Sequence, residues 1–193
     1  MTLTPSTMLE LETQAPDFRL PDVVSGQTIS LASFEDKTAL LVMFICCHCP
    51  FVKHIEQEIA QMAKDYQHKS LGMIAISSND ASKYPDDSPE NMKLMAQKLG
   101  FNFPFCYDET QEVAKLYTAA CTPDFFLYND SRKLVYRGQL DDSRPSNQIP
   151  VTGTDLRQAI DCLLAQGQIN LTQKPSIGCN IKWKPGNEPE YFA

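Results

Sequence analysis

Residues Thr38–Tyr66 read TALLVMFICCHCPFVKHIEQEIAQMAKDY, and the spacing of their apolar side chains changes half-way along. From Thr38 to Cys46 the chain is continuously apolar, which predicts a strand buried on both faces of a sheet. From Pro50 to His68 apolar residues recur instead at helical spacing, with charged residues between them. The stretch therefore predicts a strand that leads directly into an amphipathic helix, with three cysteines and a histidine at the junction.

The surrounding segments extend this unit into a larger α/β domain. A second apolar run at 71–77 completes a β-α-β unit, and two short apolar pieces around Ser25-Gly26 predict an N-terminal β-ribbon. After the unit, the pattern predicts a helix opened by Ser88-Pro89, a short helix at 109–117, strands at 124–128 and 133–137, and a last helix at 154–165. This order predicts a three-layer α/β/α domain with a mixed central sheet and a helical insertion after the β-α-β unit.

Length and composition favour a single soluble domain. A chain of 193 residues suits one domain, here 1–193, with a loose lead-in at 1–12 and an extended tail rich in proline and glycine at 174–193. The net charge of −7 argues against nucleic acid as a partner. No run approaches the ~20 apolar residues that span a bilayer. The first residues lack the features of a signal peptide, so we expect a cytoplasmic protein with no membrane partner.

Cys46 and Cys49 have the C-x-x-C spacing at the start of a predicted helix. Unpaired N–H groups and the helix dipole favour a negative charge there, and the thiolate is the reactive form of cysteine. The second sulfur lies one turn further and can reach the first, so the pair can attack a disulfide and release the product by closing on itself. We expect Cys46 to attack and Cys49 to resolve, with His48, and Lys53 from the next turn, adding positive charge nearby.

Two other interpretations of the cluster stay open. Thiolates and imidazole bind zinc or copper, so Cys46, Cys47, His48 and Cys49 could hold a metal. A closed zinc site needs about four ligands, usually with a second pair further along, and the sequence has no second C-x-x-C. The cysteines could also be small buried hydrophobic residues. The pattern favours a redox pair without metal, with Cys47 as a spectator because adjacent cysteines rarely fit disulfide geometry.

Four segments together resemble a known family: APDFRLPD, the C-x-H-C-P-F junction, AISSND, and CTPDFF before the predicted hairpin. They are similar to the alkyl hydroperoxide reductase/thiol-specific antioxidant (AhpC/TSA) family, in particular its C-x-x-C branch of TlpA- and ResA-like oxidoreductases. The resemblance runs from Ala15 to about Ala165 and implies a thioredoxin-like fold. It also implies that Pro123 is a cis-proline facing the cysteine pair, and that Thr122 and Pro123 form an edge where a substrate polypeptide docks.

Three positions depart from the family pattern. The buried Asp of thioredoxins, six residues before the first cysteine, is Leu40, and the Trp before the motif is Ile45. Peroxiredoxins place a Thr three residues before the peroxidatic cysteine, where this chain has Met43 before Cys46. The first departure removes the usual proton acceptor of the second thiol, and the last weakens a peroxidase interpretation.

The remaining residues of interest have less context. Cys121 lies two residues before Pro123 and could act as a third thiol, whereas Cys106, Cys162 and Cys179 lie in no comparable motif. We expect the acidic residues around Ser88 to complement the dipole of the helix that begins there, and the single tryptophan, Trp183, to anchor the tail. These expectations concern Asp86, Asp87 and Glu90.

The sequence therefore predicts a thiol–disulfide oxidoreductase that uses Cys46, Cys49 and His48, with Thr122 and Pro123 binding substrate. Because the dithiol itself carries two electrons, the mechanism needs no organic cofactor and no metal. Disulfide-containing proteins and an upstream dithiol reductant are the expected partners. A thiol peroxidase of the peroxiredoxin type, a copper- or zinc-binding protein, and a scaffold without turnover are the alternatives.

Overall fold

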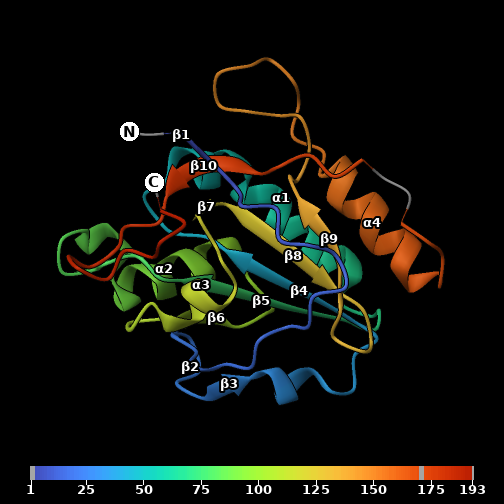
Figure 1. Cartoon of the computed structure of the whole chain (residues 1–193), viewed down its shortest axis with the longest axis horizontal. Helices are drawn as coiled ribbons and strands as arrows, with labels where there is room; N and C mark the ends of the chain where they lie inside the picture. Colours follow the sequence, from blue (N-terminus) through green and yellow to red (C-terminus); the bar gives the residue numbers. More distant parts are fainter. Residues whose placement is uncertain (1–2, 170–171, 193) are drawn as a thin grey trace.

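The computed structural model describes residues 3–169 and 172–192, and its centre is a five-stranded mixed sheet (Figure 1). The strand order is β6-β5-β4-β8-β9, in which β6, β5 and β4 are parallel, β8 runs antiparallel to its neighbours β4 and β9, and β9 therefore runs in the same direction as β4. The strands are β4 (Ala39–Phe44), β5 (Leu71–Ser77), β6 (Phe105–Tyr107), β8 (Asp124–Tyr128) and β9 (Leu134–Gly138). Every residue of β4 and β5 is buried, as their continuous apolar runs predict.

Helices and the N-terminal ribbon cover the two faces of this sheet. Leu41 and Met43 face the core shared with α1 (Pro50–Tyr66), α2 (Pro89–Leu99) and α4 (Thr154–Leu164). Leu40 and Val42 face the opposite core, shared with α3 (Glu112–Leu116) and the β2–β3 ribbon (Arg19–Pro21 and Thr28–Ser30). Because successive side chains of β4 point to opposite faces of the sheet, this strand contributes to both cores. The three-layer thioredoxin-like fold expected from the sequence is confirmed.

The second helix begins and ends where the sequence predicts. Ser88 caps α2 by accepting a hydrogen bond from the Asn91 N–H at 3.3 Å, and Pro89 is its first residue. Gly100 ends it in the left-handed conformation, at φ +67°. A 3-10 turn, η2 (Pro85–Asp87), precedes this helix and brings its acidic residues to the cysteine cluster; a second one, η1 (Leu31–Phe34), follows β3.

A small second sheet joins the two ends of the chain and differs from the expectation of a loose lead-in and an extended tail. Its order is β1-β10-β7, with bounds Leu3–Pro5, Ile177–Asn180 and Cys121–Thr122, and all its pairs are antiparallel. The tail is held by burial: Ile181 and Trp183 lie in the core beneath α3, and Trp183 meets the Tyr191 ring edge-on. Trp183 therefore anchors the tail, which returns to the domain (Figure 1).

Within the described ranges, none of the helices has the length and apolar character that crossing a membrane requires.

Candidate active site

The cysteine cluster lies in the short connection between β4 and α1. The strand ends at Phe44, the helix begins at Pro50, and Cys49 is its N-cap residue. Cys46 and Cys49 are 1% and 0% exposed, so both sulfurs lie inside the protein, whereas His48 is partly accessible. The strand-to-helix junction therefore brings together the three residues predicted as catalytic.

The two sulfurs contact each other and the cis-proline segment. A hydrogen bond links the Cys46 and Cys49 thiols. The Cys46 sulfur lies 3.4 Å from the Thr122 hydroxyl, and the Cys49 sulfur lies 3.2 Å from the Thr122 carbonyl oxygen. The Thr122–Pro123 peptide bond is cis, as the family resemblance implies. The predicted docking residues and the predicted redox pair thus form one site.

The negative charge of the reduced pair rests on Cys49, one turn later than the sequence suggests. The hydrogen bond from Cys46 lowers the pKa of Cys49 to about 5, and the Val52 N–H of the first turn of α1 also lowers it. The same hydrogen bond, followed by burial, raises the pKa of Cys46. The start of the helix contributes as well, because Cys49 is the N-cap residue of α1 and so lies nearer to its positive end than Cys46 does.

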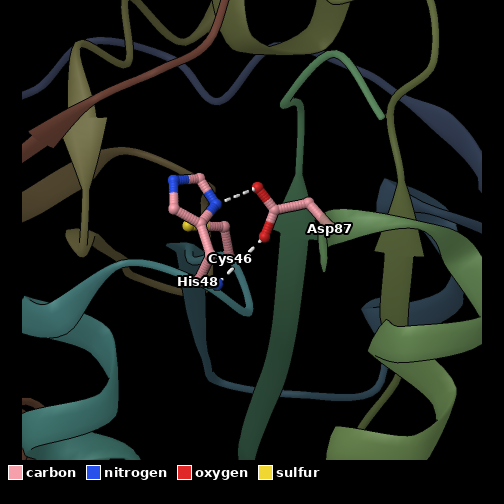
Figure 2. Close-up of side chains that lie close together, drawn as sticks. All are labelled: Cys46, His48 and Asp87. Atoms are coloured by element: carbon pink, nitrogen blue, oxygen red, sulfur yellow. Dashed lines mark hydrogen bonds and ion pairs between the residues drawn. The ribbon is translucent and has the colours of Figure 1, made fainter. Parts of the chain in front are cut away.

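His48 forms an ion pair with a carboxylate that the sequence analysis assigned only to the helix dipole. Its Nδ1 lies 2.5 Å from Oδ2 of Asp87, and the imidazole ring stacks on Tyr84. The hydrogen bond to Asp87 raises the pKa of His48 above 6.5. Figure 2 shows the Asp87 carboxylate turned toward His48, with the Cys46 side chain beside the imidazole ring. The pair with Asp87 thus holds the His48 imidazole beside Cys46 and favours its protonated form, and its role in catalysis stays a prediction.

Asp87 also fixes the backbone of the cysteine connection. Its Oδ1 accepts the N–H groups of Cys47 at 2.8 Å and His48 at 3.1 Å, and its Oδ2 also accepts the side-chain amide of Asn79 at 2.7 Å. Although burial raises the pKa of Asp87, the hydrogen bonds from His48 and Asn79 bring it below 3.8. One signal in the sequence pointed here: Asn79 follows the carboxyl end of a buried strand, where ligands and sites gather in open α/β sheets.

Among the other cysteines, Cys179 is the one that meets the pair. Its sulfur lies 2.9 Å from that of Cys49, because β10 pairs with β7 directly beside the site. Cys121, the thiol proposed from sequence, turns its sulfur toward the carbonyl oxygens of Pro123 and Ser176 at 3.6 and 4.0 Å. Burial raises the pKa of Cys47 to about 12, and its role as a spectator stays a prediction.

Three side chains of the site have atoms that could bind a metal ion. The ligand atoms of Cys46, His48 and Asp87 lie within 4.8 Å of one another. The oxygens of Asp87 already accept four hydrogen bonds from the protein, however, and a closed zinc site takes about four ligands. The donor set therefore suits an ion pair that positions the connection better than it suits a structural metal.

The sequence matches the AhpC/TSA family over residues 11–137. The chain belongs to this family. A comparison with curated proteins finds no match. Among solved structures, an uncharacterized conserved protein from Geobacillus kaustophilus is 54% identical, with 96% of this chain and 98% of that one covered at a TM-score of 0.94. A hypothetical protein from Sinorhizobium meliloti 1021 is 49% identical, with 95% of this chain and 100% of that one covered at 0.93.

A more distant similarity concerns the fold alone. A putative thiol:disulfide interchange protein DsbE from Chlorobium tepidum is 18% identical, with 81% of this chain and 99% of that one covered at a TM-score of 0.63. The family match places this chain in a redox family of the thioredoxin and peroxiredoxin type, and the distant similarity shows that it shares the thioredoxin-like fold.

Proposed function

We propose that the protein is a thiol–disulfide oxidoreductase whose Cys46–Cys49 pair exchanges electrons with protein disulfides. One observation carries the proposal: the Cys46 and Cys49 sulfurs both contact Thr122, 3.4 Å from its hydroxyl and 3.2 Å from its carbonyl oxygen, directly before a cis-proline. Neighbouring sulfurs at a helix start are the arrangement that dithiol exchange requires.

The exchange uses one proton held between the two sulfurs. Cys46 attacks one sulfur of a bound disulfide while its proton passes along the hydrogen bond to Cys49. The protonated Cys49 then donates to the Thr122 carbonyl oxygen, 3.2 Å away. A bond forms between Cys46 and the substrate, and the second substrate sulfur leaves as a thiolate that takes the proton back from Cys49. Cys49 then attacks Cys46, closing the Cys46–Cys49 bond and releasing the first substrate sulfur, which takes a proton from solvent.

His48 and Asp87 support this exchange without reacting. The imidazolium stabilises negative charge on the nearby sulfurs, and the carboxylate keeps both the imidazole and the connecting backbone in place. We further propose disulfide-containing proteins as substrates and a dithiol as the upstream reductant, with net reduction in the cytoplasm. The absence of an organic cofactor from this scheme follows from the two electrons that the dithiol carries.

The test is reduction of insulin disulfides with dithiothreitol as the electron source. The wild-type protein should accelerate the reaction, and Cys46→Ser should lose the acceleration because the attacking sulfur is gone. Cys49→Ser should instead accumulate a mixed disulfide between Cys46 and the substrate, detectable by non-reducing electrophoresis. A control is Cys162→Ser, which changes a thiol on α4 that contacts the Gln168 carbonyl and should leave the rate unchanged. Unchanged activity in Cys46→Ser would contradict the proposal.

A thiol peroxidase is the second candidate, favoured by the family match itself. Met43, which stands where a peroxiredoxin would have its Thr, is fully buried in the core beneath α1 and offers no hydroxyl. Hydrogen peroxide consumption that persists in Cys49→Ser and disappears in Cys46→Ser, without insulin reduction by the wild type, would favour the peroxidase.

A further inference from the structure

Strand β10 occupies the edge that the proposed function assigns to a substrate. In antiparallel register, Cys179 lies opposite Thr122 and Asn180 opposite Cys121, so the backbone beside the cis-proline is already paired. An extended peptide that adds a strand to an exposed edge makes the same kind of pairing. The chain thus presents a segment of its own tail to the redox pair in the way a substrate polypeptide would be presented.

The position of β10 is fixed by contacts at both ends. Before the strand, the Ser176 hydroxyl donates to the Pro123 carbonyl oxygen at 2.6 Å. After it, the Lys182 N–H donates to the Asn79 side chain at 2.8 Å, and the same amide holds Asp87. The tail is therefore connected to the hydrogen-bond network that orients the cysteine connection.

Gly178 permits the close approach of the two strands. A Cβ at this position would lie 2.0 Å from the Thr122 carbonyl oxygen and 3.1 Å from Cδ of Pro123. Only glycine can sit there without moving the backbone. The small residue before Cys179 is thus what allows β10 to reach the cis-proline segment.

The sulfur of Cys179 lies against the pair as a disulfide partner would. It is 2.9 Å from the Cys49 sulfur, within the non-bonded contact distance of two sulfur atoms and about 1 Å beyond the length of a disulfide bond. Cys179 is 1% exposed, so the contact is shielded from solvent. No rearrangement of the fold is needed for a bond between these two residues beyond a small shift of the side chains.

We propose that Cys179 is a third redox-active thiol, an internal substrate that exchanges with the Cys46–Cys49 disulfide. The inference rests on the proposed function. In the exchange, the Cys179 thiolate attacks the Cys49 sulfur of the oxidised pair, the Cys49–Cys179 bond forms, and the Cys46–Cys49 bond breaks. Cys46 leaves as a thiolate and takes the proton that Cys179 gives up. One disulfide replaces another, so no external oxidant or reductant enters the step.

The electrostatics favour this exchange only when the pair is oxidised. In the reduced protein, burial, and then the hydrogen bond and charge of Cys49, raise the pKa of Cys179 to about 12, which keeps it a thiol. Oxidation of Cys49 to a disulfide removes its charge and thus two of these causes. Lys182 lowers the pKa of Cys179 in either state. Burial remains, so Cys179 should ionise more readily when an acceptor disulfide is present than in the reduced protein.

The experiment is disulfide mapping of the full chain after oxidation with diamide, an acid quench, alkylation and non-reducing peptide mass spectrometry. Cys46→Ser should form a Cys49–Cys179 bond, and Cys179→Ser should form only Cys46–Cys49. Gly178→Ala combined with Cys46→Ser retains both Cys49 and Cys179 but displaces β10, so the Cys49–Cys179 bond should fall about tenfold relative to Cys46→Ser, since disulfide geometry tolerates little displacement. Cys162→Ser is the matched control and should leave the mapping unchanged.

The outcomes separate this inference from the function on which it rests. A Cys46–Cys49 bond in the wild type together with a Cys49–Cys179 bond in Cys46→Ser supports both. If Cys49 of Cys46→Ser stays reduced or bonds to Cys47, while the wild type still forms Cys46–Cys49, the third thiol is wrong and the proposed function stands. A wild type that forms no Cys46–Cys49 bond overturns the proposed function, and the inference with it.

Discussion

Two aspartates, Asp87 and Asp124, are equally inaccessible to solvent and each pairs with a cation, yet their pKa values move in opposite directions. Burial raises the pKa of Asp124, and the lowering by Arg137, 3.1 Å away, and by the N–H groups of Ala120 and Phe125 does not offset it. Burial also raises the pKa of Asp87, but hydrogen bonds from His48, Asn79 and two backbone N–H groups more than compensate.

The comparison shows what distinguishes a charge at the site from a charge in the scaffold. Asp87 is surrounded by donors that favour its ionised form, so its charge is available to hold His48 and the cysteine connection. Asp124 follows the cis-proline on β8, and its ion pair with Arg137 is retained in spite of the desolvation cost. Substitution of Asp124 should therefore mainly reduce stability, whereas substitution of Asp87 should also change the pKa of His48.

The largest effect on stability should come from Asp124→Asn. The variant leaves the Arg137 guanidinium buried without a counter-charge, which typically costs about 3–5 kcal/mol. Urea unfolding should show this loss, whereas the pKa of Cys49 should stay at about 5, because Asp124 is not among the main causes of its shift. A double variant, Asp124→Leu with Arg137→Met, should recover part of the loss. A change in the Cys49 pKa in Asp124→Asn would mean that the two regions are coupled.

Asp87→Asn should have a smaller effect on stability and a direct effect on the site. Loss of charged hydrogen bonds to His48 and the connection should cost about 1–3 kcal/mol. The pKa of His48 should fall back toward 6.5, and nuclear magnetic resonance titration of the imidazole measures it. His54 is the matched reference, since its Nε2 contacts Ser143 and not Asp87. A His48 pKa that does not fall in the variant would show that Asp87 is not the cause of the raised pKa of His48.

The pH dependence of stability follows from the directions of the two shifts. Because the folded pKa of His48 is raised, its contribution is fully present below 6.5 and is lost as the pH rises through the folded value. Because the folded pKa of Asp87 is lowered, its contribution is present above 3.8 and is lost as the pH falls through the folded value. The free energy of unfolding of the wild type, measured in urea as a function of pH, should therefore exceed that of Asp87→Asn most between the folded pKa values of Asp87 and His48. The difference should shrink below the first value and above the second.

The smallest expected effect is a change in the pKa of Cys49 when the hydrogen bond from Cys46 is removed. Cys46→Ala removes the hydrogen bond that is the main cause of the lowered Cys49 pKa, so this pKa should rise above about 5. The ultraviolet absorbance of the thiolate, titrated with pH, measures it. In the variant, burial still raises this pKa, whereas Cys179 and the Val52 N–H still lower it. A Cys49 pKa that stays at about 5 in the variant would show that the helix start alone sets it.

Local patterns predicted the parts of the fold that depend on neighbouring residues. The change of apolar period at the β4–α1 junction, the Ser88 cap and the Gly100 end are each encoded within a few positions. The C-x-x-C spacing and the Thr122-Pro123 dipeptide marked two segments of the site, and the family resemblance brought them together.

Contacts between distant positions could not be derived in this way. The His48–Asp87 pair joins residues 39 positions apart, and an acid before a helix is equally well explained by the helix dipole. The Cys49–Cys179 contact spans 130 positions and depends on a strand of four residues in a proline-rich tail. Short strands such as β7 and β10 carry too few residues for a periodic pattern, so the pairing that brings Cys179 to the site appears only in the structure.

The most direct test of the central claim is equilibration of the protein with mixtures of reduced and oxidised glutathione, followed by an acid quench and quantification of the Cys46–Cys49 disulfide. A redox pair should show a reversible transition, reached from both the reduced and the oxidised protein, in which Cys46 and Cys49 gain and lose their thiols together while Cys106 and Cys162 stay reduced. If Cys46 and Cys49 remain thiols at every ratio, or take up glutathione separately without bonding to each other, the helix-start sulfurs are not a redox pair.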